Sequence, residues 1–240
     1  MIFRQLFDAE TSTFTYLVAD PVTRQAALID PVLEQVDRDL ALIGELGLCL
    51  SRVLETHVHA DHVTGASSLR ERTGAITVAG NKAAPCADLH VKHGDVVALG
   101  ALEIKVLATP GHTDDSVSYL VGDRVFSGDA LLIRGTGRTD FQNGSAEALY
   151  DSITGVLFAL PDPTRVYPAH DYRGHTVSTI GEEKRSNPRL AGKDKAAFVA
   201  TMNALHLPPP KRLQEAVPAN QACGKTPSPT PTPTRQGALS

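Results

Sequence analysis

Short apolar runs separated by polar or glycine-containing breaks occupy most of the chain. Runs of this length, bounded by turn-forming residues, predict β-strands rather than helices. We expect strands within residues 14–20, 25–30, 51–56, 75–80, 95–100, 102–110, 116–129 and 164–171. The chain should therefore be rich in β-structure.

Three longer segments carry apolar residues at helical spacing. They are residues 33–47, 65–74 and 145–161, and the first of them stops at Gly47, a residue type that commonly ends helices. Because strands and helices are interspersed along the chain, we expect an α/β or layered α+β fold.

The composition is that of an ordinary globular protein. Of the 240 residues, 42% are hydrophobic and 21% are charged, which is enough apolar material to bury a full core. We expect one large domain over residues 1–224. Residues 225–240 are rich in Pro, Thr and Ser and poor in apolar side chains, so we expect a disordered tail there.

The charge pattern argues against two classes of partner. The formal net charge is -4 and no basic cluster is present, which disfavours binding to nucleic acid or to a membrane surface. No stretch approaches the roughly 18 apolar residues of a membrane span, and the N-terminal segment lacks the pattern of a secretion signal. We expect a soluble, cytoplasmic protein.

The cysteines support the same location. Cys49, Cys86 and Cys223 are odd in number and include no CxxC pair. This pattern is typical of reduced thiols in the cytoplasm rather than of a disulfide framework, and it also excludes a structural zinc site built from cysteine.

One short segment contains several residues of the types that bind metal ions. The sequence LETHVHADHVTG, residues 54–65, places His57, His59, Asp61 and His62 directly after a predicted strand. On an extended chain, residues two apart point to the same side, so the first three can converge, and a turn brings the fourth to them. A single histidine is usually a surface or capping residue, but such crowding indicates a shared metal ion such as zinc, iron or manganese.

Three further residues follow other predicted strands. They are His112 in ATPGHTDDS, Asp129 in FSGDALL and His170 in YPAHDYRG. Each by itself would be interpreted as an ordinary loop residue, but together with the first cluster they predict one metal site. The remaining histidines lack this setting and are expected in solvent or in packing contacts: His90, His93, His175 and His206.

These motifs resemble those of a known superfamily. HVHADH, GHT, GD and PAH are similar to the metal motifs of the metallo-β-lactamase superfamily, whose fold is an αββα sandwich with metals at one edge of its two sheets. That superfamily includes hydrolases, flavoprotein oxidoreductases, nucleases and dioxygenases, so the fold alone does not decide the function.

Longer segments resemble one family more closely. Residues 127–144, 167–190 and 216–224 are similar to the persulfide dioxygenases, also called sulfur dioxygenases or ethylmalonic encephalopathy proteins. The resemblance covers nearly all of residues 1–224. Thr136 departs from it, because many relatives have cysteine there, but this position is no metal ligand.

The resemblance implies a mononuclear iron centre. His57, His112 and Asp129 match the family's iron ligands, a facial triad of two histidines and one carboxylate with open positions opposite. The resemblance places the remaining four groups outside the first coordination shell: His59, Asp61, His62 and His170. Residue types alone would also permit two zinc ions, because all seven hydrolase-type ligands are present.

The implied reaction converts glutathione persulfide and O2 to sulfite and glutathione, a step of sulfide catabolism. Oxidation of the outer sulfur releases four electrons, the number that O2 accepts, so no NAD or flavin is needed, and no dinucleotide-binding glycine motif is found. Arg138 matches a substrate-side arginine suited to a glutathione carboxylate, and Tyr172 matches a tyrosine near iron and substrate. Without the resemblance, these two would be a surface ion-pair residue and a packing residue.

Two other functions stay open. A dinuclear zinc thioester hydrolase of the glyoxalase II kind would also recognise glutathione, but residues 188–217 are short for the helical substrate domain of such enzymes. A non-catalytic metal-binding or sensing module is disfavoured by open coordination positions, since structural sites tend to be closed. Family members are often dimeric, and we expect a homodimer on that basis.

Overall fold

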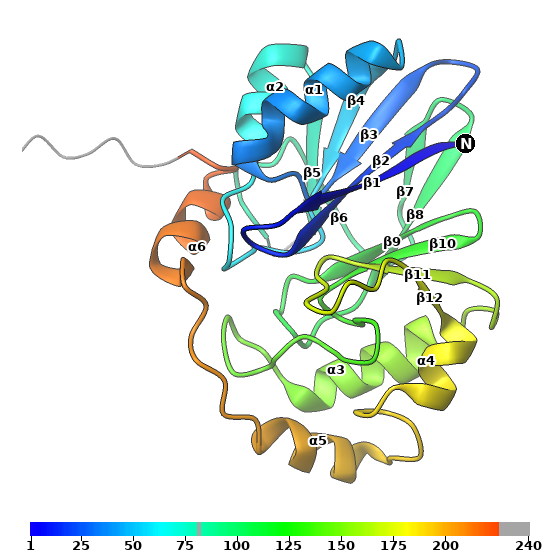
Figure 1. The fold of residues 1–240 in the computed structure, drawn as a ribbon, viewed down its shortest axis with the longest axis vertical. Helices are drawn as coiled ribbons and strands as arrows, with labels where there is room; N and C mark the ends of the chain where they lie inside the picture. Colours follow the sequence, from blue (N-terminus) through cyan, green and yellow to red (C-terminus); the bar gives the residue numbers. More distant parts are fainter. Residues whose placement is uncertain (81–82, 226–240) are drawn as a thin grey trace, which may run out of the picture.

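The computed structural model describes residues 1–80 and 83–225, which form two facing six-stranded sheets (Figure 1). The first sheet has the order β1 (Ile2–Asp8), β2 (Thr13–Ala19), β3 (Gln25–Ile29), β4 (Cys49–Leu54), β5 (Ile76–Gly80) and β6 (Leu89–Val91). The second has the order β12 (Ser178–Thr179), β11 (Arg165–Pro168), β10 (Arg124–Gly128), β9 (Val117–Val121), β8 (Leu102–Ala108) and β7 (Val96–Leu99).

A single apolar layer fills the space between the sheets. It includes Tyr16 and Leu54 from the first sheet and Val106, Tyr119 and Phe126 from the second, all nearly inaccessible to solvent. Burial of this apolar surface provides the main driving force for stacking the sheets.

Helices cover the two outer faces. A 3-10 turn (Leu33–Gln35), α1 (Val36–Glu45) and α2 (Ala66–Thr73) lie on the first sheet, as Figure 1 shows. The second sheet is covered by α3 (Ala146–Ser152), a π-helical turn (Ile153–Leu157), α4 (Ile180–Ser186) and α5 (Lys195–Asn203). This αββα arrangement confirms the predicted fold class.

Elements that the sequence pattern did not reveal lie at edges and near the C-terminus. They are β1, β6, β12, α4, α5 and α6 (Leu213–Gln221). Strand β1 is an edge strand whose apolar side chains are half-buried or, at Phe7, exposed, so its alternation is weak. Helix α6 contains Pro218, which sequence rules count against a helix interior.

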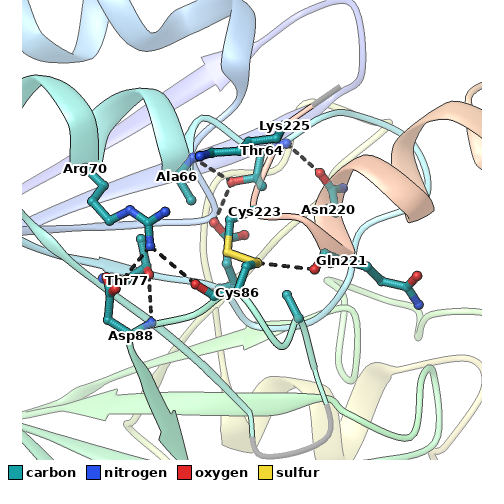
Figure 2. The surroundings of a disulfide bond; sticks show 12 residues. Thr64, Ala66, Arg70, Thr77, Cys86, Asp88, Asn220, Gln221, Cys223 and Lys225 are labelled. Carbon is teal, nitrogen blue, oxygen red and sulfur yellow. Dashed lines mark hydrogen bonds and ion pairs between the residues drawn. A yellow bond between two sulfur atoms is a disulfide. The ribbon is translucent and has the colours of Figure 1, made fainter. Parts of the chain in front are cut away.

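The prediction of reduced cysteines is wrong for two of the three. Cys86 and Cys223 form a disulfide with a Cα–Cα distance of 5.9 Å (Figure 2), whereas Cys49 is free and exposed. The pair is 137 residues apart in sequence. The spacing rules for cysteine describe short motifs, so they cannot detect a pair that only the packing of α6 brings together.

Two further expectations concern the C-terminal tail and membrane-spanning helices. The predicted tail lies outside the described residues, except for Lys225. Within residues 1–80 and 83–225, none of the helices combines the length and apolar character that a bilayer crossing requires.

Candidate metal centre

Loops after four strands deliver the predicted ligands to one edge of the sandwich. His57, His59, Asp61 and His62 follow β4, and the other three ligand-type side chains follow β8, β10 and β11. Because strand ends are held by the sheet ladders, the loops start from fixed positions. The structure brings all seven groups together, in two sets of neighbouring ligand atoms: His57, His112, Asp129 and His59, Asp61, His62, His170.

Two glycines make this convergence possible. Gly128 has a φ of 54°, and a Cβ there would lie 2.7 Å from the Oγ1 of Thr56. Gly137 passes so close to the ring of His112 that a Cβ would lie 2.7 Å from its Nδ1. Any side chain at either position would push apart the loops that carry the ligands.

The first set combines burial with access. The Nε2 of His112 lies 3.6 Å from the Oδ2 of Asp129, and one ligand atom from each of the three residues lies within 4.8 Å of the others. His57 is buried, whereas the side chains of His112 and Asp129 are each 13% exposed. One side of the set therefore reaches solvent.

Hydrogen bonds fix which nitrogen of each histidine is free. The Nδ1 of His112 lies 2.7 Å from the carbonyl of Arg138, which can only accept, so Nδ1 carries the proton and Nε2 keeps its lone pair. The hydroxyl of Thr56 donates to Asp30 at 2.9 Å and so accepts from the Nδ1 of His57 at 2.9 Å. Both histidines thus present a free Nε2, as metal ligands do.

Asp129 is oriented in the same way. Its Oδ1 accepts a hydrogen bond of 2.7 Å from the Nδ1 of His170, which leaves Oδ2 toward His112. Burial would raise the pKa of Asp129, but His170 holds this pKa below its usual range. Burial, with the neighbouring His59, lowers the pKa of His57. An ionised carboxylate and a neutral imidazole are the forms that bind a divalent metal, so the set fits such an ion.

The second set contains a histidine with no free nitrogen. The Nδ1 of His170 faces Asp129 and its Nε2 faces Asp61 at 2.8 Å. Burial would lower the pKa of His170, but the two carboxylates raise it well above its usual value. A ring that donates from both nitrogens has no lone pair for a metal.

Two acids behind the site, the buried Asp30 and the partly buried Glu55, were not found from the sequence. The Nε2 of His59 lies 3.2 Å from Asp30 and 3.8 Å from Glu55. Burial opposes charge on this ring, yet Asp30 raises the pKa of His59 to about 9. A signal for Asp30 was available, because it directly follows β3, the parallel neighbour of β4, and so lies at the same sheet edge.

Tyr172 lies at the surface beside the buried network. Its ring is nearly parallel to that of His170, with 6.1 Å between centroids, and the residue is 70% exposed. Its hydroxyl has no hydrogen-bond partner among the described residues. The ring therefore borders the site on the solvent side.

Arg138 makes contacts within the chain. Its guanidinium forms hydrogen bonds of 2.6 and 2.7 Å with the two carboxylate oxygens of Asp140, and it bonds the carbonyls of Leu207 and Pro208. It also lies 4.3 Å from the centre of the Phe141 ring. The same residue orients His112 through its backbone carbonyl, so its structural role is clear, and its predicted role in substrate binding stays a prediction.

Comparison with known proteins places these residues in a family. The model of the metallo-beta-lactamase superfamily matches residues 9–85 and 87–170. The human mitochondrial persulfide dioxygenase ETHE1 is 47% identical over 227 residues, which cover 93% of this chain and 89% of that protein. The crystal structure of ETHE1 from Myxococcus xanthus has a TM-score of 0.93 at 64% identity and covers 94% of this chain and 100% of that one. The chain belongs to the persulfide dioxygenase family.

Membership of the persulfide dioxygenase family confirms the resemblance that the long sequence motifs indicated. A hydrolase is also related, although at lower identity. The hydroxyacylglutathione hydrolase of Nitrobacter hamburgensis is 37% identical over 214 residues, which cover 85% of this chain and 79% of that protein. Persulfide dioxygenases and this hydrolase therefore share one scaffold, and the site has to distinguish them.

Proposed function

We propose that the protein is an iron-dependent dioxygenase that oxidises glutathione persulfide with O2 to sulfite and glutathione, with one iron(II) per chain. The proposal rests on which histidine nitrogens and carboxylate oxygens are left free to bind a metal. His57, His112 and Asp129 each present one free ligand atom, whereas both nitrogens of His170 are engaged by carboxylates. The site thus supports one metal ion better than two.

Iron(II) on this triad would supply open positions for a persulfide sulfur and O2, and redox chemistry that zinc lacks. The reaction balances without another cofactor. Glutathione persulfide, O2 and water yield glutathione and sulfurous acid, and the sulfur gives up the four electrons that O2 takes. Relatives named persulfide dioxygenase support this substrate class.

The chain's own groups would position the reactants. The carbonyl of Arg138 holds His112, and Thr56 with Asp30 holds His57, so neither ring can turn as the substrate binds. His170 holds protons between Asp129 and Asp61 beside the site. We assign Tyr172, on the open side, and Arg138 to substrate contact, and residues 1–224 to one catalytic domain.

A second function is favoured by a specific observation. His59, Asp61 and His62 lie close enough to contribute to a second metal position, and a hydroxyacylglutathione hydrolase is among the relatives. A dinuclear zinc thioester hydrolase is therefore the alternative.

Location and assembly also stay proposals. We keep the cytoplasm as the compartment and a homodimer as the assembly, with no nucleic-acid or membrane partner. Because Cys86 and Cys223 form a disulfide, the cysteines no longer support a cytoplasmic location. The charge pattern still supports the absence of these partners.

Metal analysis combined with two assays tests the proposal. Protein purified under reducing conditions without added metal should hold about one iron per chain, since a facial triad supplies one site. It should consume O2 with glutathione persulfide and release sulfite in equal amount. Two zinc ions per chain, with hydrolysis of a hydroxyacyl-glutathione thioester and no persulfide-dependent O2 uptake, would establish the alternative.

A further inference from the structure

The C-terminal helix α6 is packed against the loop that carries the histidine cluster. Ala216 and Ala219 on this helix contact Val63. Just beyond it, the carbonyl of Cys223 accepts a hydrogen bond of 2.9 Å from the backbone of Ser67. A Cβ on Gly224 would lie 2.0 Å from the carbonyl of Thr64, so the two backbones are in direct contact.

One polar side chain of α6 points into this contact. Asn220 is buried, and its Oδ1 accepts a hydrogen bond of 2.8 Å from the backbone N–H of Thr64. Its Nδ2 donates to the carbonyl of His59 at 2.9 Å and to that of His62 at 2.8 Å. Both amide protons and one acceptor position of this side chain therefore form hydrogen bonds with the same loop. Figure 2 shows Asn220 beside Thr64.

The loop needs these bonds because it is not part of a helix or strand. A buried irregular segment must satisfy its backbone groups through side chains or water. Val58 is held from the other side by the carboxylate of Asp115 at 2.9 Å, but the carbonyls of His59 and His62 have Asn220 as their partner.

A covalent tether holds α6 in this place. Cys223, three residues after Asn220 in the chain, forms a disulfide with Cys86 (Figure 2). Cys86 lies in the segment between β5 and β6. The helix is thus fixed both by apolar contact and by a covalent bond, and the amide of Asn220 has a defined position from which to act.

We propose that Asn220 is a positioning residue of the metal centre. Its carboxamide sets the backbone of residues 59–64 and thereby the places of the His59, Asp61 and His62 side chains beside the triad. It touches neither substrate nor metal and acts through that loop. The activity part of its test rests on the proposed dioxygenase function, whereas the spectroscopic and exchange parts do not.

Three variants separate positioning from packing. Asn220→Asp keeps the size and the acceptor for Thr64, but it loses both donations and directs a carboxylate oxygen at two carbonyls. Asn220→Ala removes all three bonds. Gln221→Ala is the matched control, because Gln221 is the next residue on the helix and is exposed.

Two measurements need no turnover. Cobalt(II) loaded in place of the native metal should show a visible absorption spectrum in Asn220→Asp that differs from wild type, while Gln221→Ala should match wild type. In metal-free protein, hydrogen exchange at the Thr64 amide should be faster in Asn220→Ala than in Asn220→Asp, which keeps its acceptor.

Turnover per bound iron supplies the third measurement. Groups behind metal ligands typically change activity by about 10- to 100-fold, and we expect Asn220→Asp to lose about tenfold in kcat with little change in KM for the persulfide. An unchanged cobalt spectrum with turnover equal to that of Gln221→Ala would refute the proposal. Failure of both Asn220 variants to fold would refute it as well, because the residue would then serve the fold and not the site. Wild-type protein without persulfide-dependent O2 uptake would reject only the proposed function.

Discussion

At the residue scale, the hydrogen bonds of His170 distinguish it from the other ligand-type histidines. Its two ring nitrogens face Asp129 and Asp61, and the first of these contacts orients the Asp129 oxygen that remains free. The seven ligand-type residues are therefore not equivalent, although their types alone are those of a dinuclear site.

The first prediction separates the triad from its neighbours. Asp129→Ala should lose metal and activity together, because the only anionic ligand of the triad is removed. His62→Ala should keep the metal while turnover falls by about 10- to 100-fold, as changes behind the ligands usually do. Metal content by elemental analysis and O2 uptake measure both. Metal loss in the His62 variant with retention in the Asp129 variant would reverse the assignment.

The second prediction concerns Arg138, whose guanidinium holds Asp140 and two carbonyls. If it also holds a glutathione carboxylate, Arg138→Ala should lower kcat/KM for glutathione persulfide by about 10- to 100-fold, the effect of losing one charge-assisted bond. A small persulfide without that carboxylate should be affected far less. O2 uptake at equal iron content compares the two substrates. Equal losses on both would show that Arg138 only braces its loop.

The third prediction concerns Asp39, a buried carboxylate on α1 with one oxygen lacking a hydrogen-bond partner among the described residues. Burial raises its pKa from 3.8 to about 6, although Arg38 opposes the shift. A raised acid pKa means that the charged form destabilises the fold, so the cost is absent below pH 4 and complete above pH 6.

Asp39→Asn should therefore increase the free energy of unfolding by about 1 to 3 kcal/mol at pH 7 and change it little at pH 4. Urea unfolding at the two pH values measures this difference. Asp37→Asn on the same helix is the control, since its side chain is exposed and its ion pair with Arg72 should contribute little. The same gain at both pH values would mean that charge is not the cause.

At the scale of the element, α4 shows how a short helix is held in place. Thr179 and Glu182 form a reciprocal capping box at its N-terminus. The helix then presents the buried Glu183, whose carboxylate accepts from the backbone of Arg134 at 2.9 Å and from Asn187 at 2.8 Å. The segment after Asp129 is thus braced from α4.

The fourth prediction follows from that cap. Thr179→Ala should lower the free energy of unfolding by about 1 kcal/mol, the usual cost of removing a helix cap. Chemical denaturation measures this, and Ser186→Ala at the exposed end of the same helix should have almost no effect. Equal stability of the two variants would show that the cap contributes nothing beyond packing.

At the scale of the whole molecule, the disulfide connects segments that are otherwise far apart in the chain. It closes a loop between residues 137 positions apart, so it restricts the unfolded chain strongly. It also links α6, the helix that carries Asn220, to the outer face of the first sheet.

The fifth prediction is that Cys86→Ser lowers the free energy of unfolding by about 2 to 5 kcal/mol. Treatment of the wild type with a dithiol reductant should have a similar effect. Cys49→Ser is the control, because Cys49 is a free, exposed thiol. Denaturant unfolding of the metal-loaded protein compares the three. Coincident midpoints for the two serine variants would show that the bond does not restrain the unfolded chain.

The sequence by itself determined what local pattern and residue type encode. Alternation and helical spacing located most central strands and the helices α1, α2 and α3, because buried faces impose their period on the chain. The ligand-type residues were also found, since each stands next to a strand end within a distinctive motif. The edge strands β1, β6 and β12 and the helices α4, α5 and α6 were not predicted, because weak burial leaves a weak period, whereas the edge strand β7 was predicted.

Only the tertiary structure decided which groups are partners. The lone pairs of His57 and His112 depend on Thr56 and on the Arg138 carbonyl, and the state of His170 depends on two carboxylates from other loops. Cys86 and Cys223, like Asn220 and the loop it holds, meet across more than a hundred residues. Such contacts arise from the packing of whole layers, and no spacing along the chain encodes them, because hydrogen bonding and bonding between sulfurs act over a few ångströms in space.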